Sequence, residues 1–356
     1  MPELEIDRNL PVCVTGATGY VAGWVVKRLL EEGLTVHATV RDPNNEAKLA
    51  HLRAVEATAP GTLKFFHADL LEEGSFHAAV QGCGVVFHTA SPFKIDVEDP
   101  MEDLVKPAEQ GTRNLLAAVE AADTVTRVVL TSSCAAIYGD NIDLQSTPRG
   151  VFDEEVWNTS SSLEHQAYSY SKTRAEKAAW EIADAQSRWR LVVVNPSLVL
   201  GPGLKIHGGS ESFNIIKQMG DGTMKAGVPD LGFGVVDVRD LAEAHLRAGF
   251  VADAQGRHVI SGHDTSYPQM AEALRPTYGA NYPIPARVLP KWLIWLFGPM
   301  MNEVLTRKVV SRNINYPWKG DNTKSRQALG VTYRPLGETM NDFFAQLVDA
   351  GEVKAA

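Results

Sequence analysis

Two tyrosines close to a lysine are the first candidates for chemistry, in the stretch AYSYSKT at residues 167–173. Tyr168 lies four residues before Lys172, and Tyr170 lies two residues before it. On a helix, side chains four apart share a face, whereas those two apart point about 200° from each other. A nearby cation stabilises a phenolate and lowers a tyrosine pKa from its usual value near 10. In a helix, Tyr168 can therefore be a proton donor tuned by Lys172, although the spacing also fits an ordinary helix face.

Two hydroxyl groups at the end of a β-rich run are the second candidates. The run VVLTSSCAAIYG at residues 128–139 places Ser132 and Ser133 where a strand is expected to end. Ligands of open α/β sheets bind at the carboxyl ends of the strands. A serine there would donate a hydrogen bond to a substrate oxygen, and the position alone leaves both serines open.

A glycine-rich turn near the N-terminus predicts a dinucleotide site. In TGATGYVAG, Gly16 and Gly19 are three residues apart, and Ala22 follows three residues later. Gly16 can make the tight turn, Gly19 lets the backbone approach a pyrophosphate, and a small residue at position 22 permits close helix packing. The turn follows an apolar strand and opens a helix, whose N-terminus would face the phosphates.

Positive charge after the second expected strand favours NADP(H). Arg41 stands at the strand tip, where many NAD sites carry an acid, and Lys48 lies seven residues further on. Two cations there suit a 2′-phosphate. The alternative is that both are solvated surface charges and that Asp42 reaches the ribose diol. Asp69, after the third strand, is expected to contact the adenine or to cap the next helix.

The elements that must position these groups alternate short apolar runs with longer helical patterns. Strands are expected at Val12–Thr15, Thr35–Arg41, Leu63–His67, Val85–Thr89, Val128–Thr131, Leu191–Asn195 and Gly256–Ile260, helices at Tyr20–Glu32 and Ser169–Gln186, and a strand turning into a helix at Gly232–Ala248. Repeated βα units with nearly continuous apolar strands indicate a parallel sheet covered on both faces.

The fold class is therefore α/β, a Rossmann-type doubly wound parallel sheet with a smaller C-terminal lobe. We expect an NADP-binding domain at residues 8–200, to which residues 232–262 return. Residues 201–231 and 263–356 are expected to form the substrate-binding lobe.

Composition disfavours several kinds of partner. The chain has 356 residues and a formal net charge of −9, which argues against nucleic acid or an anionic membrane. The N-terminus shows no signal-peptide pattern, and the apolar run Trp292–Phe297 is too short to span a bilayer. Three cysteines without metal-ligand spacing predict a cytoplasmic location and no metal site.

These motifs together resemble those of an extended short-chain dehydrogenase/reductase. More narrowly, the chain is similar to the dihydroflavonol reductase and cinnamoyl-CoA reductase group and its bacterial and fungal aldehyde and ketone reductase relatives. The resemblance covers nearly the whole chain and is carried by VTGATGYVAGW (14–24), VRDPNNEAKLAHL (40–52), HTASPF (88–93), GTRNLL (111–116), VVLTSSCAAIYG (128–139), YSYSKTRAEKAAW (168–180), NPSLVLGPG (195–203) and VDVRDLAEAHL (236–246).

The resemblance implies a role for each matching position. Tyr168 would be the general acid, Lys172 would hold the nicotinamide ribose and lower the tyrosine pKa, and Ser133 would hydrogen-bond the carbonyl oxygen. Ser133 is preferred to Ser132 because the group's catalytic serine directly precedes three small or apolar residues that lead to an aliphatic residue, here Cys134-Ala135-Ala136 and Ile137. Asn114 matches a position that supports the active site. The implied cofactor contacts are Gly16, Thr18, Gly19, Tyr20, Val21, Arg41, Lys48, Asp69, Leu70, Thr89, Ala90, Ser91, Thr131, Tyr168, Lys172, Pro196, Ser197 and Val199.

Two departures from the group bear on the substrate. Cinnamoyl-CoA reductases carry an Asn-Trp-Tyr lead-in to the catalytic helix, whereas His165, Gln166 and Ala167 precede the tyrosine here, which weakens an acyl-CoA interpretation. The segment Asn141–Gly150 gives no clear match to the substrate-selecting residues of the plant flavonoid enzymes. A flavonoid substrate is therefore not supported.

The sequence thus predicts NADPH-dependent reduction of an aldehyde or ketone, with hydride from nicotinamide C4 and a proton from Tyr168. Trp, Phe, Met and Pro are frequent late in the chain, which favours a hydrophobic or aromatic substrate, and the expected assembly is a monomer or homodimer. One alternative is an NAD-dependent sugar-nucleotide epimerase or dehydratase, which Arg41 and Lys48 disfavour. The other is a non-catalytic dinucleotide-sensing protein, which Tyr168 and Lys172 disfavour.

Several other residues are interpreted as structural. His88 lies at a strand end without a catalytic partner, and Cys134 has no identifiable base that would activate it. Residues 237–240 carry two acids and an arginine and predict an ion-paired helix start. The Trp292–Phe297 cluster fits core packing, a substrate pocket or an oligomer contact equally well.

Overall fold

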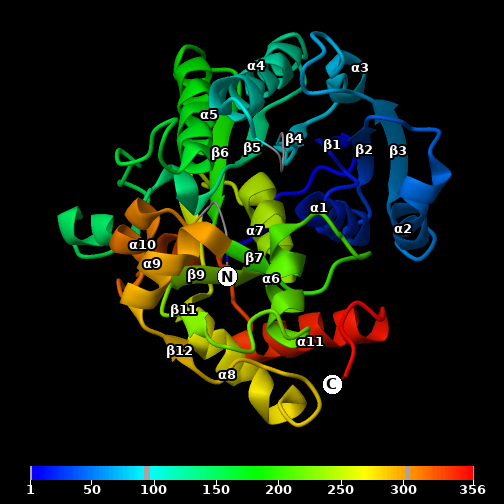
Figure 1. Ribbon diagram of the computed structural model, residues 1–356. Helices are drawn as coiled ribbons and strands as arrows, with labels where there is room; N and C mark the ends of the chain where they lie inside the picture. The colour runs from blue at the N-terminus through cyan, green and yellow to red at the C-terminus, as the bar shows by residue number, and fades with distance from the viewer. Residues whose placement is uncertain (1, 92–96, 302–304, 356) are drawn as a thin grey trace.

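A seven-stranded sheet forms the centre of the larger domain (Figure 1). The computed structural model describes residues 2–91, 97–301 and 305–355, so Pro92 and Phe93 of the HTASPF motif lie outside the described residues. The strand order is β10-β6-β5-β4-β1-β2-β3, and all neighbouring strands are parallel. The strands are β1 (Val12–Val14), β2 (Thr35–Val40), β3 (Thr62–His67), β4 (Val85–His88), β5 (Arg127–Thr131), β6 (Arg190–Pro196) and β10 (Gly256–Ile260).

Helices cover both faces of this sheet, which explains why its central strands are apolar along their whole length. Gly33 adopts a left-handed backbone (φ 77°) just after the first helix and so ends it. One face packs against α1 (Tyr20–Glu31), α2 (Glu46–Glu56) and α7 (Val238–Phe250). The other face packs against α3 (His77–Val80), α4 (Lys106–Glu120, preceded by the π-helix Met101–Val105) and α5 (Ala167–Asp184).

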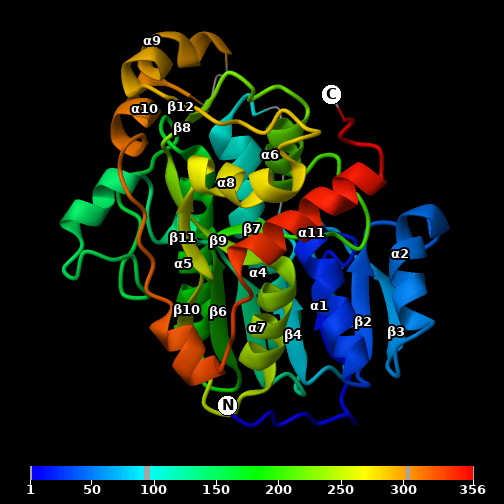
Figure 2. The same cartoon turned by 90° about the horizontal axis from the view of Figure 1, so that it is seen from below.

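A smaller lobe lies at the carboxyl ends of these strands (Figure 2). The chain enters it directly from the large sheet, since the first strand of the lobe begins two residues after β6 ends. Its three-stranded sheet has the order β11-β9-β7, and β8 pairs with β12. The strands are β7 (Leu198–Leu200), β8 (Val228–Pro229), β9 (Gly232–Asp237), β11 (His263–Ser266) and β12 (Val288–Leu289). The helices are α6 (Glu211–Gly220), α8 (Tyr267–Tyr278), α9 (Lys291–Met301), α10 (Arg307–Asn313) and α11 (Leu336–Asp349).

The expected Rossmann-type parallel fold is confirmed, but the lobe boundaries differ from the expectation. Residues 232–262 were expected to return to the larger domain, yet β9 pairs with β7 and β11 in the small sheet. Only α7 and β10 return. Strand β7, expected within residues 8–200, also belongs to the small sheet. An apolar run predicts that a strand forms, but the run itself does not specify the strand with which it pairs.

Helix α9 carries the apolar cluster predicted at Trp292–Phe297, and most of that cluster is exposed. Ile294 is buried against α10, whereas Trp292 is 66% exposed and Phe297 is 46% exposed. Core packing therefore does not account for this run, and an apolar ligand or a protein contact remains. Within the described ranges, no helix is long and apolar enough to cross a membrane.

Candidate active site

The glycine turn between β1 and α1 fits a phosphate group. Gly16 has a left-handed backbone (φ 65°), and a Cβ atom there would lie 3.0 Å from the Ala90 Cβ. Both the backbone conformation and the lack of space therefore disfavour a larger residue. Gly19 is the N-cap of α1 and offers no capping side chain, and the first turn holds no acid. Among the residues that the structure describes, no side chain accepts from the first N–H groups of α1. An anion at this helix N-terminus would supply the acceptor and interact favourably with the helix dipole.

A hydroxyl group at the end of β1 organises the end of β4. The Thr15 Oγ1 atom accepts hydrogen bonds from the backbone N–H groups of Thr89 (3.1 Å) and Ala90 (3.0 Å), which leaves its own proton for His88 Nδ1 at 2.9 Å. Burial and the positive charge of Lys172 lower the His88 pKa to about 3. His88 is therefore neutral and acts as a structural acceptor, in agreement with its interpretation from sequence.

The two cations predicted to contact a 2′-phosphate are both available. Arg41 follows the end of β2, and Lys48 lies in the first turn of α2. Both side chains are exposed, and neither forms an ion pair with any residue that the structure describes. Asp42 accepts a hydrogen bond from the backbone N–H of Asn44 and so stabilises the turn between β2 and α2.

Three of the residues expected to bind the cofactor have other contacts in the structure. The Tyr20 hydroxyl donates to the Gly201 carbonyl at 2.5 Å, and its ring packs in the smaller lobe. Asp69 Oδ1 accepts from the Leu71 N–H at 2.9 Å and so stabilises the turn after β3, whereas the next helix, α3, has Phe76 as its N-cap. Thr131 bonds to His245 Nε2 at 2.7 Å.

The remaining expected contacts lie around the carboxyl ends of the strands. Asn114 donates to the Leu70 carbonyl at 2.8 Å and accepts from Gln110. It therefore positions the loop after β3 and has no hydrogen bond to Lys172 among the described residues. Thr18, Val21 and Val199 are half-buried, whereas Pro196 and Ser197, at the end of β6, are buried.

The tyrosine and lysine pair lies in the first turns of α5. The Lys172 Nζ atom donates to the Ser91 hydroxyl at 2.8 Å and lies 5.7 Å from the centre of the Tyr168 ring. Lys172 is buried, whereas Tyr168 is 47% exposed. Tyr170 contacts Arg174 instead, with 3.3 Å between Arg174 Nη1 and the Tyr170 hydroxyl. The predicted difference between the two tyrosine faces is confirmed, and only Tyr168 lies beside the lysine.

The two serines at the end of β5 have different partners. The Ser132 hydroxyl is buried and donates to Glu176 Oε2 at 2.5 Å. The Ser133 oxygen instead accepts the Ala135 N–H at 3.1 Å and caps a short 3-10 helix, Cys134–Ala136, which lies beside α5. Within the described part of the chain, no acceptor takes the Ser133 proton. Ser133 is therefore free to donate to a substrate oxygen, and Ser132 is not.

The buried carboxylate of Glu176, which was not predicted from the sequence, supports this site. Glu176 is only 1% exposed, and its Oε1 pairs with Arg257 Nε on β10 at 2.6 Å. Its Oε2 accepts from Ser132 and from Asn195 Nδ2 at 2.8 Å, and Asn195 also donates to the Ser133 carbonyl. The only signal in the sequence is that Glu176 stands four residues after Lys172 on the same helix face.

A second missed carboxylate holds the residue that leads into α5. Asp140 is fully buried and contacts His165 Nε2 (2.7 Å), Arg312 Nε (2.5 Å) and Asn313 Nδ2 (2.7 Å). Burial alone would raise the Asp140 pKa, but these hydrogen bonds outweigh it and hold that pKa below its usual value. Gln166, next in the chain, adopts a left-handed backbone (φ 58°). Asp140 thus joins α10 of the smaller lobe to the start of the helix that carries Tyr168.

Replacing His165 by alanine is expected to lower kcat about tenfold while the KM for the cofactor stays the same. The substitution removes the contact that orients the start of α5 but touches no part of the phosphate turn. A His165→Gln variant keeps a donor for Asp140 and should recover most of the rate. Steady-state kinetics of both variants check this expectation, and an equal loss in both would contradict a positioning role for the hydrogen bond.

Comparison with known proteins identifies the family. Residues 12–260 match the NAD dependent epimerase/dehydratase family. The chain therefore belongs to this family of extended short-chain dehydrogenases/reductases, and the predicted resemblance is confirmed.

Its relatives include several reductases. Cinnamoyl-CoA reductase CAD2 of Medicago truncatula is 41% identical over 270 residues, which cover 75% of this chain and 80% of the relative. Tetraketide alpha-pyrone reductase 1 of Arabidopsis thaliana is 36% identical over 96% of each chain. The structure of yeast methylglyoxal/isovaleraldehyde reductase Gre2 complexed with NADPH has 27% identity and a TM-score of 0.76, covering 97% of this chain and all of the other.

Proposed function

We propose that the protein reduces an aldehyde or ketone to an alcohol with NADPH. The observation that carries the proposal is the arrangement at the carboxyl ends of the strands. Tyr168 is exposed beside a buried Lys172, and Ser133 keeps a free proton next to the same helix. The three groups supply a proton donor, a cation and a hydrogen-bond donor for one oxygen atom.

Each side chain has a separate task in this reaction. The bound cofactor supplies the hydride. Tyr168 donates its proton to the carbonyl oxygen, and the Ser133 hydroxyl donates a hydrogen bond to the same oxygen. Lys172 favours loss of the tyrosine proton through its positive charge, and its contact with Ser91 fixes the ammonium at the end of β4. Asn195 donates a hydrogen bond to the Ser133 carbonyl and so holds its backbone in place. Glu176 holds the side chain of the neighbouring Ser132.

NADPH is proposed over NADH because of the unpaired cations after β2. Arg41→Ala is expected to raise the KM for NADPH about tenfold to a hundredfold, since hydrogen bonds to charged groups contribute about 1.5–3 kcal/mol. The KM for NADH should change less than twofold. Kinetics with both cofactors measure the difference, and equal effects would remove the 2′-phosphate from the proposal. Yeast Gre2, which shares the fold, was solved with NADPH.

A medium-sized hydrophobic or aromatic carbonyl compound is the proposed substrate. The exposed aromatic side chains of α9 provide apolar surface on the smaller lobe. The relatives named above are reductases of cinnamoyl-CoA, a tetraketide pyrone and small aldehydes, so carbonyl reduction is shared while the substrate varies.

The direct test follows NADPH consumption with a panel of aromatic aldehydes, aliphatic aldehydes and diketones. Turnover of carbonyl compounds with formation of the alcohol is the expected result. A sugar-nucleotide epimerase or dehydratase would instead carry its cofactor through purification and consume none. Binding of the cofactor without turnover on any compound would indicate a dinucleotide-sensing protein.

A further inference from the structure

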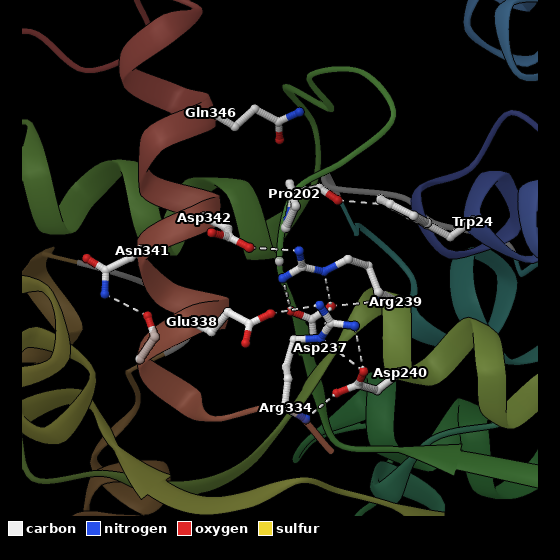
Figure 3. A network of polar contacts seen from close by, with 12 residues as sticks. Trp24, Pro202, Asp237, Arg239, Asp240, Arg334, Glu338, Asn341, Asp342 and Gln346 are labelled. Carbon is white, nitrogen blue, oxygen red and sulfur yellow. Dashed lines mark hydrogen bonds and ion pairs between the residues drawn. The ribbon is translucent and has the colours of Figure 1, made fainter. Parts of the chain in front are cut away.

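The loop that follows β7, residues 201–207, is bonded to α1 through Pro202 and Trp24 (Figure 3). Trp24 Nε1 on α1 donates to the Pro202 carbonyl at 2.8 Å. From the other side, the Gln346 amide on α11 accepts from the Gly203 N–H at 2.8 Å and donates to the Gly203 carbonyl at 2.6 Å. The loop is therefore held by α1 of the larger domain and by α11 of the smaller lobe.

Helix α11, which holds this loop, is itself held on α7 by ion pairs (Figure 3). Arg239 contacts both oxygens of Asp237, at 2.9 and 2.8 Å, and reaches Asp342 on α11 at 2.7 Å. Arg334, just before α11, pairs with Asp240 at 2.8 Å. This confirms the ion-paired helix start predicted for residues 237–240. The loop thus rests on a network of buried and half-buried charges rather than on a single contact.

The next residues of the loop lie over α1 and α2, the second of which carries Lys48 in its first turn. A Cβ atom added to Gly23 would lie 3.4 Å from Leu204 on the loop and 4.0 Å from Leu52 on α2. Lys205 is half-buried and has no ion pair within the described residues. Burial and then the charge of Lys48 lower the Lys205 pKa.

Among the described residues, the surroundings of these two lysines offer no compensating negative charge. Burial, followed by the Lys205 charge, lowers the pKa of both His51 and His207 to about 4, so both rings are neutral near pH 7. No acid lies within ion-pair distance of either lysine in the part of the chain that the structure describes. Two like charges brought together without a partner repel each other, and a bound anion would remove the repulsion.

We propose that Lys205 is a third cation for the 2′-phosphate of NADPH, brought to the site by a loop of the smaller lobe. The proposal rests on the proposed NADPH-dependent function. Arg41 and Lys48 come from the β2 and α2 region, whereas Lys205 approaches from the loop anchored on α11. The discrimination between NADPH and NADH is therefore shared between the two parts of the molecule, and the lobe that is proposed to bind the substrate also holds the cofactor's adenosine end.

The test measures binding of 2′,5′-ADP and 5′-AMP to the full chain by titration calorimetry, without catalysis. Lys205→Met keeps the apolar stem that packs on the helices but removes the charge. The expected result is about fivefold to tenfold weaker binding of 2′,5′-ADP with 5′-AMP unchanged, and a smaller loss at high salt. The control Lys225→Met removes an exposed lysine from a different part of the smaller lobe and should change neither affinity.

The outcomes separate this proposal from the one on which it rests. Unchanged 2′,5′-ADP affinity in Lys205→Met, together with weaker binding in Arg41→Ala, would overturn only the role of Lys205. If Lys205→Met weakens the binding of 2′,5′-ADP and 5′-AMP equally, the role of Lys205 is also overturned. The charge would then act on the loop and not on the 2′-phosphate. If the unmodified protein binds 5′-AMP as tightly as 2′,5′-ADP, the proposed preference for NADPH itself fails.

Discussion

Tyr168→Phe is expected to lower kcat for carbonyl reduction by about a thousandfold or more, because a positioned general acid contributes roughly 10²–10⁴-fold. The variant loses only the phenolic hydroxyl. That hydroxyl has no hydrogen-bond partner among the described residues, and the side chain is 47% exposed, so folding should not suffer. The affinity for NADPH should change less than threefold. Single-turnover rates and the quenching of protein fluorescence by NADPH measure the two quantities separately.

Tyr170→Phe is the matched control for this prediction. It removes the same hydroxyl two residues away, from a side chain that contacts Arg174 and not Lys172. Its kcat should stay within about twofold of the unmodified protein. A Tyr168→Phe protein that still turns over, or a Tyr170→Phe protein that loses equal activity, would contradict the assignment of the proton donor.

Arg257→Met is expected to lower the free energy of unfolding by about 3–5 kcal/mol, because it leaves a buried carboxylate without its cation. Glu176 is 1% exposed and has its ion pair with Arg257 at 2.6 Å. The same guanidinium donates to the Val156 carbonyl at 2.7 Å, so a buried acceptor also loses its partner. Urea denaturation followed by far-UV circular dichroism measures the change.

Three further variants, Arg113→Met, Glu176→Gln and a double variant, show whether the charge is the cause. Arg113→Met breaks an exposed ion pair with Glu181 on the same helix as Glu176 and should cost less than about 1 kcal/mol. The double variant Arg257→Met/Glu176→Gln should recover part of the lost stability, since it removes the uncompensated charge. A double variant as unstable as the sum of the two single variants would mean that the buried pair is not coupled.

The larger domain was predictable because its information is local. The glycine turn, the apolar strands and the spacing of Tyr168 and Lys172 are each properties of a short stretch, and helical periodicity alone separates Tyr168 from Tyr170. The structure agrees with these expectations to within about two residues at most element ends. The choice of Ser133 over Ser132, made by resemblance, has a physical basis in their different hydrogen-bond partners.

The supporting carboxylates could not be predicted, because their partners are distant in the sequence. Arg257 stands 81 residues after Glu176, and Arg312 stands 172 residues after Asp140. Neither pair follows a helical or strand period, so each depends on how the lobes pack. For the same reason the sequence could not predict that the Tyr20 hydroxyl donates to the Gly201 carbonyl, 181 residues later.

The interleaved path of the chain limits how this protein could have diversified. The chain leaves the large sheet at β7, returns at α7, leaves again at β11 and returns near Leu329 before α11. No single stretch of sequence encodes the smaller lobe, so recombination at two crossover points cannot replace it with a lobe from another protein. New specificity on this scaffold must accumulate by point substitution and by loop insertion. Genes that differ widely in the residues around the substrate should therefore still align along their full length.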